Sequence, residues 1–525
     1  MSVPPQVPAP IITEHGLLVP FGRFAAQIGL MDRLNQVLFA MKTVDHSPGE
    51  KLTELLVHIL AGGMHVTELE TSPHPLVHDT AVAQAWGQDS FASASGVSDL
   101  LRAASPDTVR TLKEAIQQVL APYRRRILRD LTAAFLTVDF DLTGLVVSDQ
   151  AKTYEGADFG YMGEVGGVGR GYQFARAQLV GPHGPLILGG FLHPGHTVSL
   201  HCVAELVTLV EAEVGRPHRR VAAVEQRLAA AEGQLAKLEA ALAKRAQGSP
   251  TTSSRQHERL QVRTERTRTE VARLRERRDG LATENATNSN PRRILLRLDG
   301  GFGDAEHLTW LYEQGYDFVV RPYSHRIGER LRQEEGLTWE KVSKNGFVAE
   351  SRRTTLGTCP YPLRVFACRQ WWGEDRPERW SALVVNPELD RAAWPVRRVG
   401  VFYNQRQVAE ASIKESKGIF ASRHLPTRHE AGIAVYQELV LLVQNLMRWF
   451  RRQCLGHTPL ATAGIKELVR VGANSRALLI RSGRALGIRF AADGPWQGLT
   501  VLSAHVSYQL WFPFLEESRF ARAAP

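Results

Sequence analysis

The chain has 525 residues, and its 64 Lys and Arg residues outnumber 54 Asp and Glu residues, which gives a formal net charge of +10. This length exceeds one ordinary domain, so we expect two to four folded units, each with its own core and no need for disulfides or structural metals. The positive charge favours a polyanionic partner, nucleic acid above all. The four cysteines lie far apart without a Cys-x-x-Cys pair or a His at zinc spacing, which predicts reduced, buried thiols.

No apolar run approaches the roughly 20 residues that a membrane helix needs. Residues 1–10 also lack a basic stretch followed by an apolar core, so the sequence predicts no secretory leader. We therefore expect a cytosolic protein that works next to the genome and has no membrane partner.

Residues 17–121 have the pattern of short helices, with apolar side chains every three or four residues. Ser47 followed by Glu50 predicts one helix start, and Ser105 followed by Pro106 predicts another. Short helices joined by tight turns are compatible with a helix-turn-helix DNA reader. A helical cap without DNA contact explains the same pattern equally well.

From Phe135 the apolar period changes to two, which predicts a strand that carries Asp139 and Asp141 on one face near its end. Further strands are expected at residues 172–180 and 186–192. The glycines of residues 163–171 lead into a strand and not into a helix, so they indicate a hairpin turn and not a dinucleotide site.

Residues 221–286 carry two long runs of apolar side chains at 3-4 spacing, broken by residues 248–254 with their Gly, Pro and Ser. This pattern predicts an antiparallel coiled-coil hairpin. Its second arm holds nine arginines against four glutamates between Arg255 and Arg278. The arm either lies along DNA phosphates or serves as a charged dimerisation arm, and the sequence favours neither.

After the hairpin, residues 294–298 and 316–320 predict two strands that enclose a helix capped by Asp304. This order indicates a central mixed sheet flanked by helices. Strand-like segments then dominate residues 323–395, where we expect a β-rich insertion.

One helical stripe collects chemically active side chains near the end of this region. At 100° per residue, five groups fall on a face about 80° wide, and Gly418 ends the helix. They are Tyr403, Arg406, Glu410, Lys414 and Lys417. Such a face suits a metal-binding carboxylate with cations that hold DNA phosphates, but an exposed face with i, i+4 ion pairs explains it as well.

Two other carboxylates, Asp141 in Asp-Leu-Thr and Asp299 in Asp-Gly-Gly-Phe, follow predicted strands. Together with Tyr-x2-Arg-x3-Glu-x6-Lys at residues 403–417, they resemble the Asp, Asp, Glu triad of the bacterial insertion-sequence DDE transposases with the Tyr-Arg-Glu-Lys signature. The resemblance covers most of the chain and implies an RNase H-like catalytic domain. Asp139 lies on the same strand face as Asp141 and stays open as an alternative first ligand.

The resemblance implies a transposase that cleaves transposon ends and joins them to target DNA. Asp141, Asp299 and Glu410 would be catalytic and hold two Mg²⁺ ions, which Mn²⁺ could replace. Tyr403, Arg406, Lys414 and Lys417 are assigned to DNA binding. The implied partners are double-stranded DNA, as terminal inverted repeats and target, and a second copy of the chain in a paired-end complex. The location would be the bacterial cytoplasm, associated with the nucleoid.

The predicted fold class is α/β, an RNase H-like mixed sheet flanked by helices, with an all-α N-terminal domain and two insertions. The expected divisions are 1–125 (helical, DNA-binding), 130–216, 291–322 and 396–455 (catalytic), 217–290 (coiled-coil hairpin), 323–395 (β-rich insertion) and 456–525 (C-terminal region). Two rival functions remain: an RNase H-like nuclease without strand transfer, and a catalytically inactive, transposase-derived DNA-binding protein.

Overall fold

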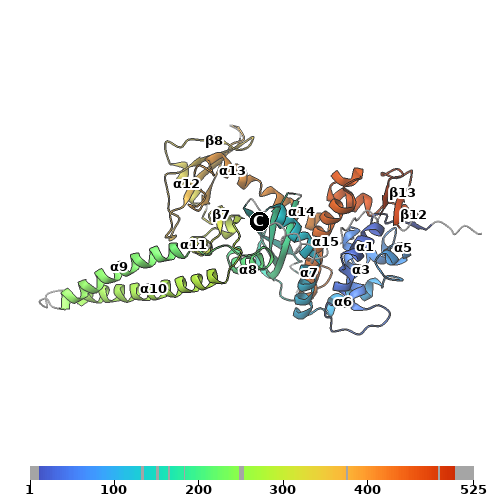
Figure 1. The fold of residues 1–525 in the computed structure, drawn as a ribbon, viewed down its shortest axis with the longest axis horizontal. Helices are drawn as coiled ribbons and strands as arrows, with labels where there is room; N and C mark the ends of the chain where they lie inside the picture. Colours follow the sequence, from blue (N-terminus) through green and yellow to red (C-terminus); the bar gives the residue numbers. More distant parts are fainter. Residues whose placement is uncertain are drawn as a thin grey trace, which may run out of the picture.

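The computed structural model describes residues 11–131, 135–148, 150, 153–163, 166–182, 184–246, 254–324, 326–373, 376–482 and 485–502. Within these ranges no helix combines the length and the apolar character that crossing a membrane would require. Figure 1 shows an elongated molecule with a long pair of helices at one end and the N-terminal helices at the other.

The N-terminal region is helical, as its apolar spacing predicts. Ser47 and Ser105 each accept a hydrogen bond from the backbone three residues on and complete the capping boxes that start two of its helices. The helices are α1 (Leu18–Gln27), α2 (Leu30–Leu34), α3 (Pro48–Leu60), α4 (Glu68–Thr71), η1 (Leu76–His78), α5 (Thr80–Ala85), α6 (Ala94–Arg102) and α7 (Pro106–Asp130).

A ten-stranded mixed sheet forms the centre of the molecule, in the order β3-β4-β2-β6-β7-β11-β10-β9-β8, with β5 paired to β4. Strand β2 runs parallel to β6, and β6 runs parallel to β7, whereas the other pairs are antiparallel. The strands are β2 (Leu136–Val146), β3 (Asp158–Met162), β4 (Gly167–Gly181), β5 (Gly184–Pro194), β6 (Ile294–Leu298), β7 (Asp317–Val320), β8 (Glu340–Lys341), β9 (Gly346–Glu350), β10 (Arg364–Gln370) and β11 (Arg379–Val385).

The first of these strands extends further than the sequence indicated. We expected Asp139 and Asp141 near the end of the strand, but β2 continues to Val146 and places both in its interior. The reason is the long partner β4, which pairs with β2 from Val138 to Val146. The length of β2 is set by hydrogen bonds to a neighbouring strand, and the local sequence does not show these bonds.

The β-rich segment 323–395 does not form a sheet of its own. Its strands extend the central sheet, because Val384 and Val385 of β11 pair with Val320 and Val319 of β7. The pairing covers an edge of β7 that would otherwise expose unpaired backbone groups. The short helix α12 (Arg326–Arg332) packs on these outer strands.

Two long helices, α9 (Val221–Ala246) and α10 (Ser254–Ala286), project from the sheet as the pair that Figure 1 shows. We call this pair the helical arm. Its helices bury an apolar seam between them, with Val224, Leu228, Val271 and Leu274 at its centre. The arm follows η2 (Ser199–Cys202) and α8 (Val203–Val214), which pack on the sheet.

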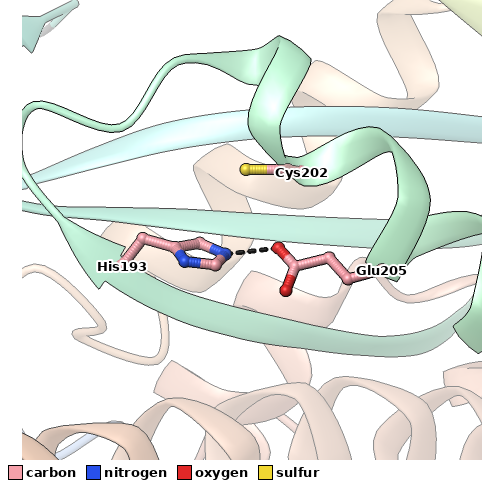
Figure 2. A group of neighbouring side chains, drawn as sticks. All are labelled: His193, Cys202 and Glu205. Carbon is pink, nitrogen blue, oxygen red and sulfur yellow. Dashed lines mark hydrogen bonds and ion pairs between the residues drawn. The ribbon is translucent and has the colours of Figure 1, made fainter.

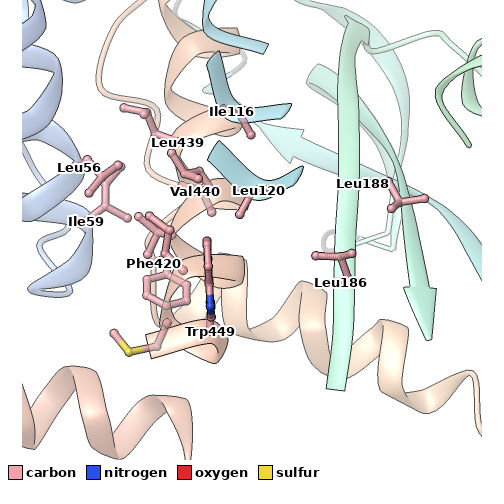
Figure 3. Close-up of a cluster of buried hydrophobic side chains, with 14 of the residues drawn as sticks. Leu56, Ile59, Ile116, Leu120, Leu186, Leu188, Phe420, Leu439, Val440 and Trp449 are labelled. Carbon is pink, nitrogen blue, oxygen red and sulfur yellow. The ribbon is translucent and has the colours of Figure 1, made fainter. Parts of the chain in front are cut away.

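The largest core joins the N-terminal helices to the sheet through α15 (Glu430–Cys454). Figure 3 shows Leu56 and Ile59 of α3 on one side of α15 and Leu186 and Leu188 of β5 on the other. Between Gly432 and Phe450 nearly every side chain of α15 is buried, as expected for a helix that is covered all round. The N-terminal helices therefore share one core with the sheet.

The C-terminal region is built on the N-terminal helices. A second sheet has the order β1-β12-β13-β14, so that the first described strand pairs with a strand near the other end of the chain. Its strands are β1 (Ile12–Thr13), β12 (Ala477–Ser482), β13 (Ala485–Phe490) and β14 (Thr500–Leu502). The helical segments η4 (Pro459–Thr462), α16 (Ile465–Glu467) and the π-helix η5 (Leu468–Gly472) lead into it.

Candidate active site

The parallel register of β2 and β6 brings Asp141 and Asp299 together. Asp139 lies opposite Arg297 in this register, so two further residues along each strand place Asp141 next to Asp299. Side chains two residues apart share a face of the sheet. Two carboxylates that are 158 positions apart therefore point to the same place by strand pairing alone.

The turn after β6 fixes one oxygen of Asp299. Its Oδ1 accepts a hydrogen bond from the backbone of Gly301 at 2.9 Å and caps η3 (Gly300–Phe302), ahead of helix α11 (Ala305–Glu313). A Cβ at Gly301 would lie 2.4 Å from the Oγ atom of Ser199 in η2. The second glycine of the motif is thus required by a close approach of η2 to this turn.

The signature residues lie on two helices, whereas the sequence predicted one. Helix α13 (Val396–Asn404) ends after Tyr403, and α14 (Gln407–Gly418) carries Glu410, with Arg406 at the break. Arg406 keeps helical dihedrals, so the break is local. The guanidinium of Arg406 is buried, and because of the break a uniform 100° projection does not describe all five groups.

Arg406 contacts all three candidate carboxylates. Its Nη2 atom lies 3.1 Å from Oδ2 of Asp141 and 3.3 Å from Oδ2 of Asp299, and its Nη1 atom lies 4.0 Å from Oε1 of Glu410. Nη2 also donates to the backbone carbonyl of Phe140 at 3.2 Å. The fold thus gathers Asp141, Asp299 and Glu410, from β2, β6 and α14, around one guanidinium.

Burial and charge act against each other at these groups. Burial raises the pKa of Asp141 to about 6, Arg406 opposes this shift, and Asp299 adds to it. Burial by itself would lower the pKa of Arg406, but Asp141 and Asp299 raise it above its usual value. Arg176 of β4 also lowers the pKa of Asp141, so this carboxylate lies between two buried cations.

Asp139, the alternative first ligand, is engaged elsewhere. Its Oδ1 and Oδ2 accept hydrogen bonds from Arg297 at 2.6 and 2.8 Å, and its side chain is fully buried. Arg297 also donates to the carbonyl of Phe402 at 3.0 Å, which ties α13 to the sheet. Asp141, and not Asp139, is the carboxylate of this strand that faces Arg406.

The four residues assigned to DNA binding have different environments. Tyr403 is buried, donates from its hydroxyl to the carbonyl of Leu298 at 3.2 Å, and has a pKa that burial raises to about 12. Arg406 is buried among the carboxylates. Lys414 is exposed, and Lys417, half-buried, donates to the carbonyl of Gly144 at 2.8 Å. Only the two lysines have surface that a DNA phosphate could reach without rearrangement.

Arg176 is a buried cation of the site that sequence reasoning missed. It lies opposite Asp141 on β4 and donates to Ser416 at 3.2 Å and to the carbonyl of Ala409 at 3.3 Å, which holds α14 against the sheet. Burial lowers its pKa to about 10. Only the pairing of β2 with β4 could have revealed it, because nothing near Arg176 in sequence marks it.

A cavity of about 280 Å³ opens beside Lys417 at the end of α14. Arg423, His424 and Arg470 also line it, whereas no Asp or Glu does. Ala421 on its wall has φ of 52°, a left-handed conformation that costs a non-glycine residue energy and that packing must hold in place. The charged side chains that line this cavity are therefore all basic.

The three carboxylates offer oxygen ligands to a hard divalent cation, but with Arg406 among them their oxygens are not all within 4.8 Å of one another. Such ions prefer oxygen ligands, and Mg²⁺ keeps several waters besides one or two carboxylates. The side chains of Asp299 and Glu410 are 34 % and 56 % exposed, so solvent and ions reach them. This donor set suits Mg²⁺ better than a soft metal.

A second group of possible ligands lies on β5, η2 and α8. Figure 2 shows His193 of β5 facing Glu205 of α8, with the thiol of Cys202 beside them. His193 and Glu205 are hydrogen-bonded to each other, and burial raises the pKa of Cys202 to about 12. The sequence predicted a buried, reduced thiol but not these neighbours, which strand β5 brings close.

Residues 263–506 match the family model described as transposase DDE domain, group 1. This match supports a DDE transposase. The match includes Asp299 and Glu410 but begins after Asp141, so the structure is what joins Asp141 to the transposase region. No curated protein matches the chain.

The mixed sheet with its flanking helices is consistent with an RNase H-like DDE transposase. Such transposases typically use divalent metals, and a transposase implies DNA as its partner. The matched description names no Tyr-Arg-Glu-Lys signature, so membership of the signature-bearing group stays a prediction.

Proposed function

We propose that this chain is a DNA transposase that cleaves transposon ends and joins the freed ends to target DNA. The observation that carries the proposal is the convergence of Asp141, Asp299 and Glu410 on Arg406. The three carboxylates come from three distant parts of the chain, and the last two lie within the matched transposase region.

In this proposal Asp141, Asp299 and Glu410 hold two Mg²⁺ ions, for which Mn²⁺ could substitute. The ions would activate the attacking water or 3′-hydroxyl and stabilise the leaving oxygen of an in-line phosphoryl transfer. Arg406 keeps the carboxylates together before DNA arrives. Lys414 and Lys417 then hold phosphates at the open side, while Tyr403 and Arg176 fix α13 and α14 on the sheet.

The proposed partners follow from the same chemistry. The DNA would comprise terminal inverted repeats and a target duplex, and two copies of the chain would pair two ends. The protein would act at the bacterial nucleoid.

Exchange of Asp299 for Asn tests the proposal, because it removes a metal-binding charge but keeps the shape and the cap of η3. We expect Asp299→Asn to lower cleavage of a duplex that carries the element's end roughly thousandfold or more, while binding of that duplex persists. Asp304→Asn is the matched control, because Asn can replace Asp as the cap of α11. Cleavage by Asp299→Asn at the wild-type rate would overturn the assignment.

A second assay separates the transposase from its closest rival. Precut ends incubated with wild-type protein, Mg²⁺ and a plasmid should become covalently joined to the plasmid, and a chelator should prevent this. Cleavage without joining would identify a nuclease, and binding without either reaction would identify an inactive DNA-binding protein.

A further inference from the structure

Four arginines in the outer half of the helical arm form one stripe on α10. They are Arg255, Arg259, Arg263 and Arg266, and all four are exposed. At 100° per residue their side chains fall within an arc of about 80°. No other residue from 255 to 266 projects into this arc, so the stripe is purely cationic. We propose that this arginine stripe binds the phosphate backbone of double-stranded DNA.

The arginines of α10 that follow the stripe are ion-paired. Arg268 pairs with Glu239 of α9 at 2.8 Å, and Arg275 pairs with Glu232 at 2.6 Å. Arg277 reaches Glu313 of α11 at 3.1 Å. These ion pairs join the two helices and connect the arm to α11.

The arginine stripe has no such partners. Within the described part of the chain, no carboxylate lies within ion-pair distance of its four guanidinium groups, and the acidic Glu258 and Glu265 project away from the arc. Four neighbouring like charges repel one another unless anions neutralise them. An anion with charges spaced along a line satisfies them best, and duplex DNA is such an anion.

The apolar side chains of the arm argue against a second copy as the occupant. Val224, Leu228, Val271 and Leu274 are already buried in the seam between α9 and α10. Among the described residues of the arm, Val262 is the only large apolar side chain that is clearly exposed. A self-associating coiled coil needs a repeated apolar face on its outside, and the arm lacks one.

The length of the arm sets the reach of this contact. The 33 residues of α10 extend about 50 Å, which corresponds to roughly 15 base pairs of duplex. Figure 1 shows the arm projecting away from the sheet, so its outer half would touch DNA well beyond the catalytic residues. The inference rests on the proposed function for its choice of DNA as partner.

The test measures binding of the full chain to a fluorescent random-sequence duplex of roughly 40 base pairs by anisotropy, from about 50 to 200 mM salt. A chelator is present, so no cleavage is needed. The variant Arg259→Gln with Arg263→Gln removes two charges of the stripe. Lys237→Gln with Lys244→Gln is the matched control, because these lysines are exposed on α9, the other helix of the arm.

We expect the arginine variant to bind about tenfold more weakly near 0.1 M salt, with a salt dependence reduced by about two phosphate contacts. The lysine variant should stay within about twofold of wild type. Equal losses in both variants, or none in either, would overturn the proposal. Loss of an oligomer in light scattering with unchanged DNA affinity would instead identify a second copy as the occupant.

Two further measurements keep the outcome clear. Gln preserves helix propensity at exposed sites, and circular dichroism should show the same helix content in every variant. If the first pair fails this check, Arg255→Gln with Arg266→Gln repeats the test. Should the chain bind DNA through the stripe yet fail to cleave it, the proposed catalytic function fails and the arm assignment stands.

Discussion

The central sheet and the N-terminal helices both bury a carboxylate completely, but they treat its charge in opposite ways. In the sheet, Asp139 receives two hydrogen bonds from Arg297, so its charge is matched by a buried cation. In helix α3, Glu54 accepts a hydrogen bond from the backbone of Ala92 at 2.8 Å, while its Oε1 atom has no partner. Burial raises the pKa of Glu54 to about 8. The sheet is built to hold ions, whereas the helical region holds a neutral acid.

The largest expected effect comes from breaking the matched pair. Arg297→Ala leaves Asp139 buried without a cation, which should cost about 3–5 kcal/mol in the free energy of unfolding. Urea unfolding followed by circular dichroism measures it. Arg259→Ala, at an exposed position of the arm, is the control and should change stability by less than about 0.5 kcal/mol. Similar values for both variants would contradict the structural role of the pair.

Because burial raises the pKa of Glu54, we expect the free energy of unfolding to depend on pH. A folded-state pKa near 8, against 4.5 when unfolded, means that the folded chain retains a proton which the unfolded chain has released. Stability should therefore fall as pH rises towards 8. Relative to Glu54→Gln, which cannot ionise, wild type should lose about 2 kcal/mol between roughly pH 6.5 and 8.5.

Urea unfolding at the two pH values measures this difference. If the stability of wild type and Glu54→Gln changes in parallel with pH, then Glu54 is either ionised in the folded state or exposed. In that event the contrast between the two regions would disappear.

The smallest expected effect is the loss of stability on removing the N-cap of α3. Ser47 caps α3, because its Oγ atom accepts a hydrogen bond from the backbone N–H of Glu50 and its own backbone N–H donates to Oε2 of Glu50. Ser47→Ala should cost about 1 kcal/mol. Ser47→Asp should retain most of the stability, because Asp also caps helices. A thermal unfolding series of these variants checks the prediction, and an unaffected Ser47→Ala would show that tertiary packing alone fixes the start of α3.

Local patterns were sufficient for much of this chain. The capping boxes at Ser47 and Ser105, the two helices of the arm and the strand with Asp139 and Asp141 all follow from side-chain periodicity and turn chemistry. These signals act between residues a few positions apart, so one segment contains them. The single helix expected across residues 403–417 was wrong in detail, because α13 ends at Asn404 and α14 begins at Gln407.

Sequence by itself determined which residues carry charge and which faces of helices and strands are apolar. Only the tertiary structure decided that β8–β11 extend the central sheet, that Arg297 is bound to Asp139, and that Arg406 lies among Asp141, Asp299 and Glu410. The physical reason is the separation in sequence between the residues that interact. Periodicity reports neighbours along the chain, whereas strand register and ion pairing join residues more than a hundred positions apart, and their energies depend on burial that exists only after folding.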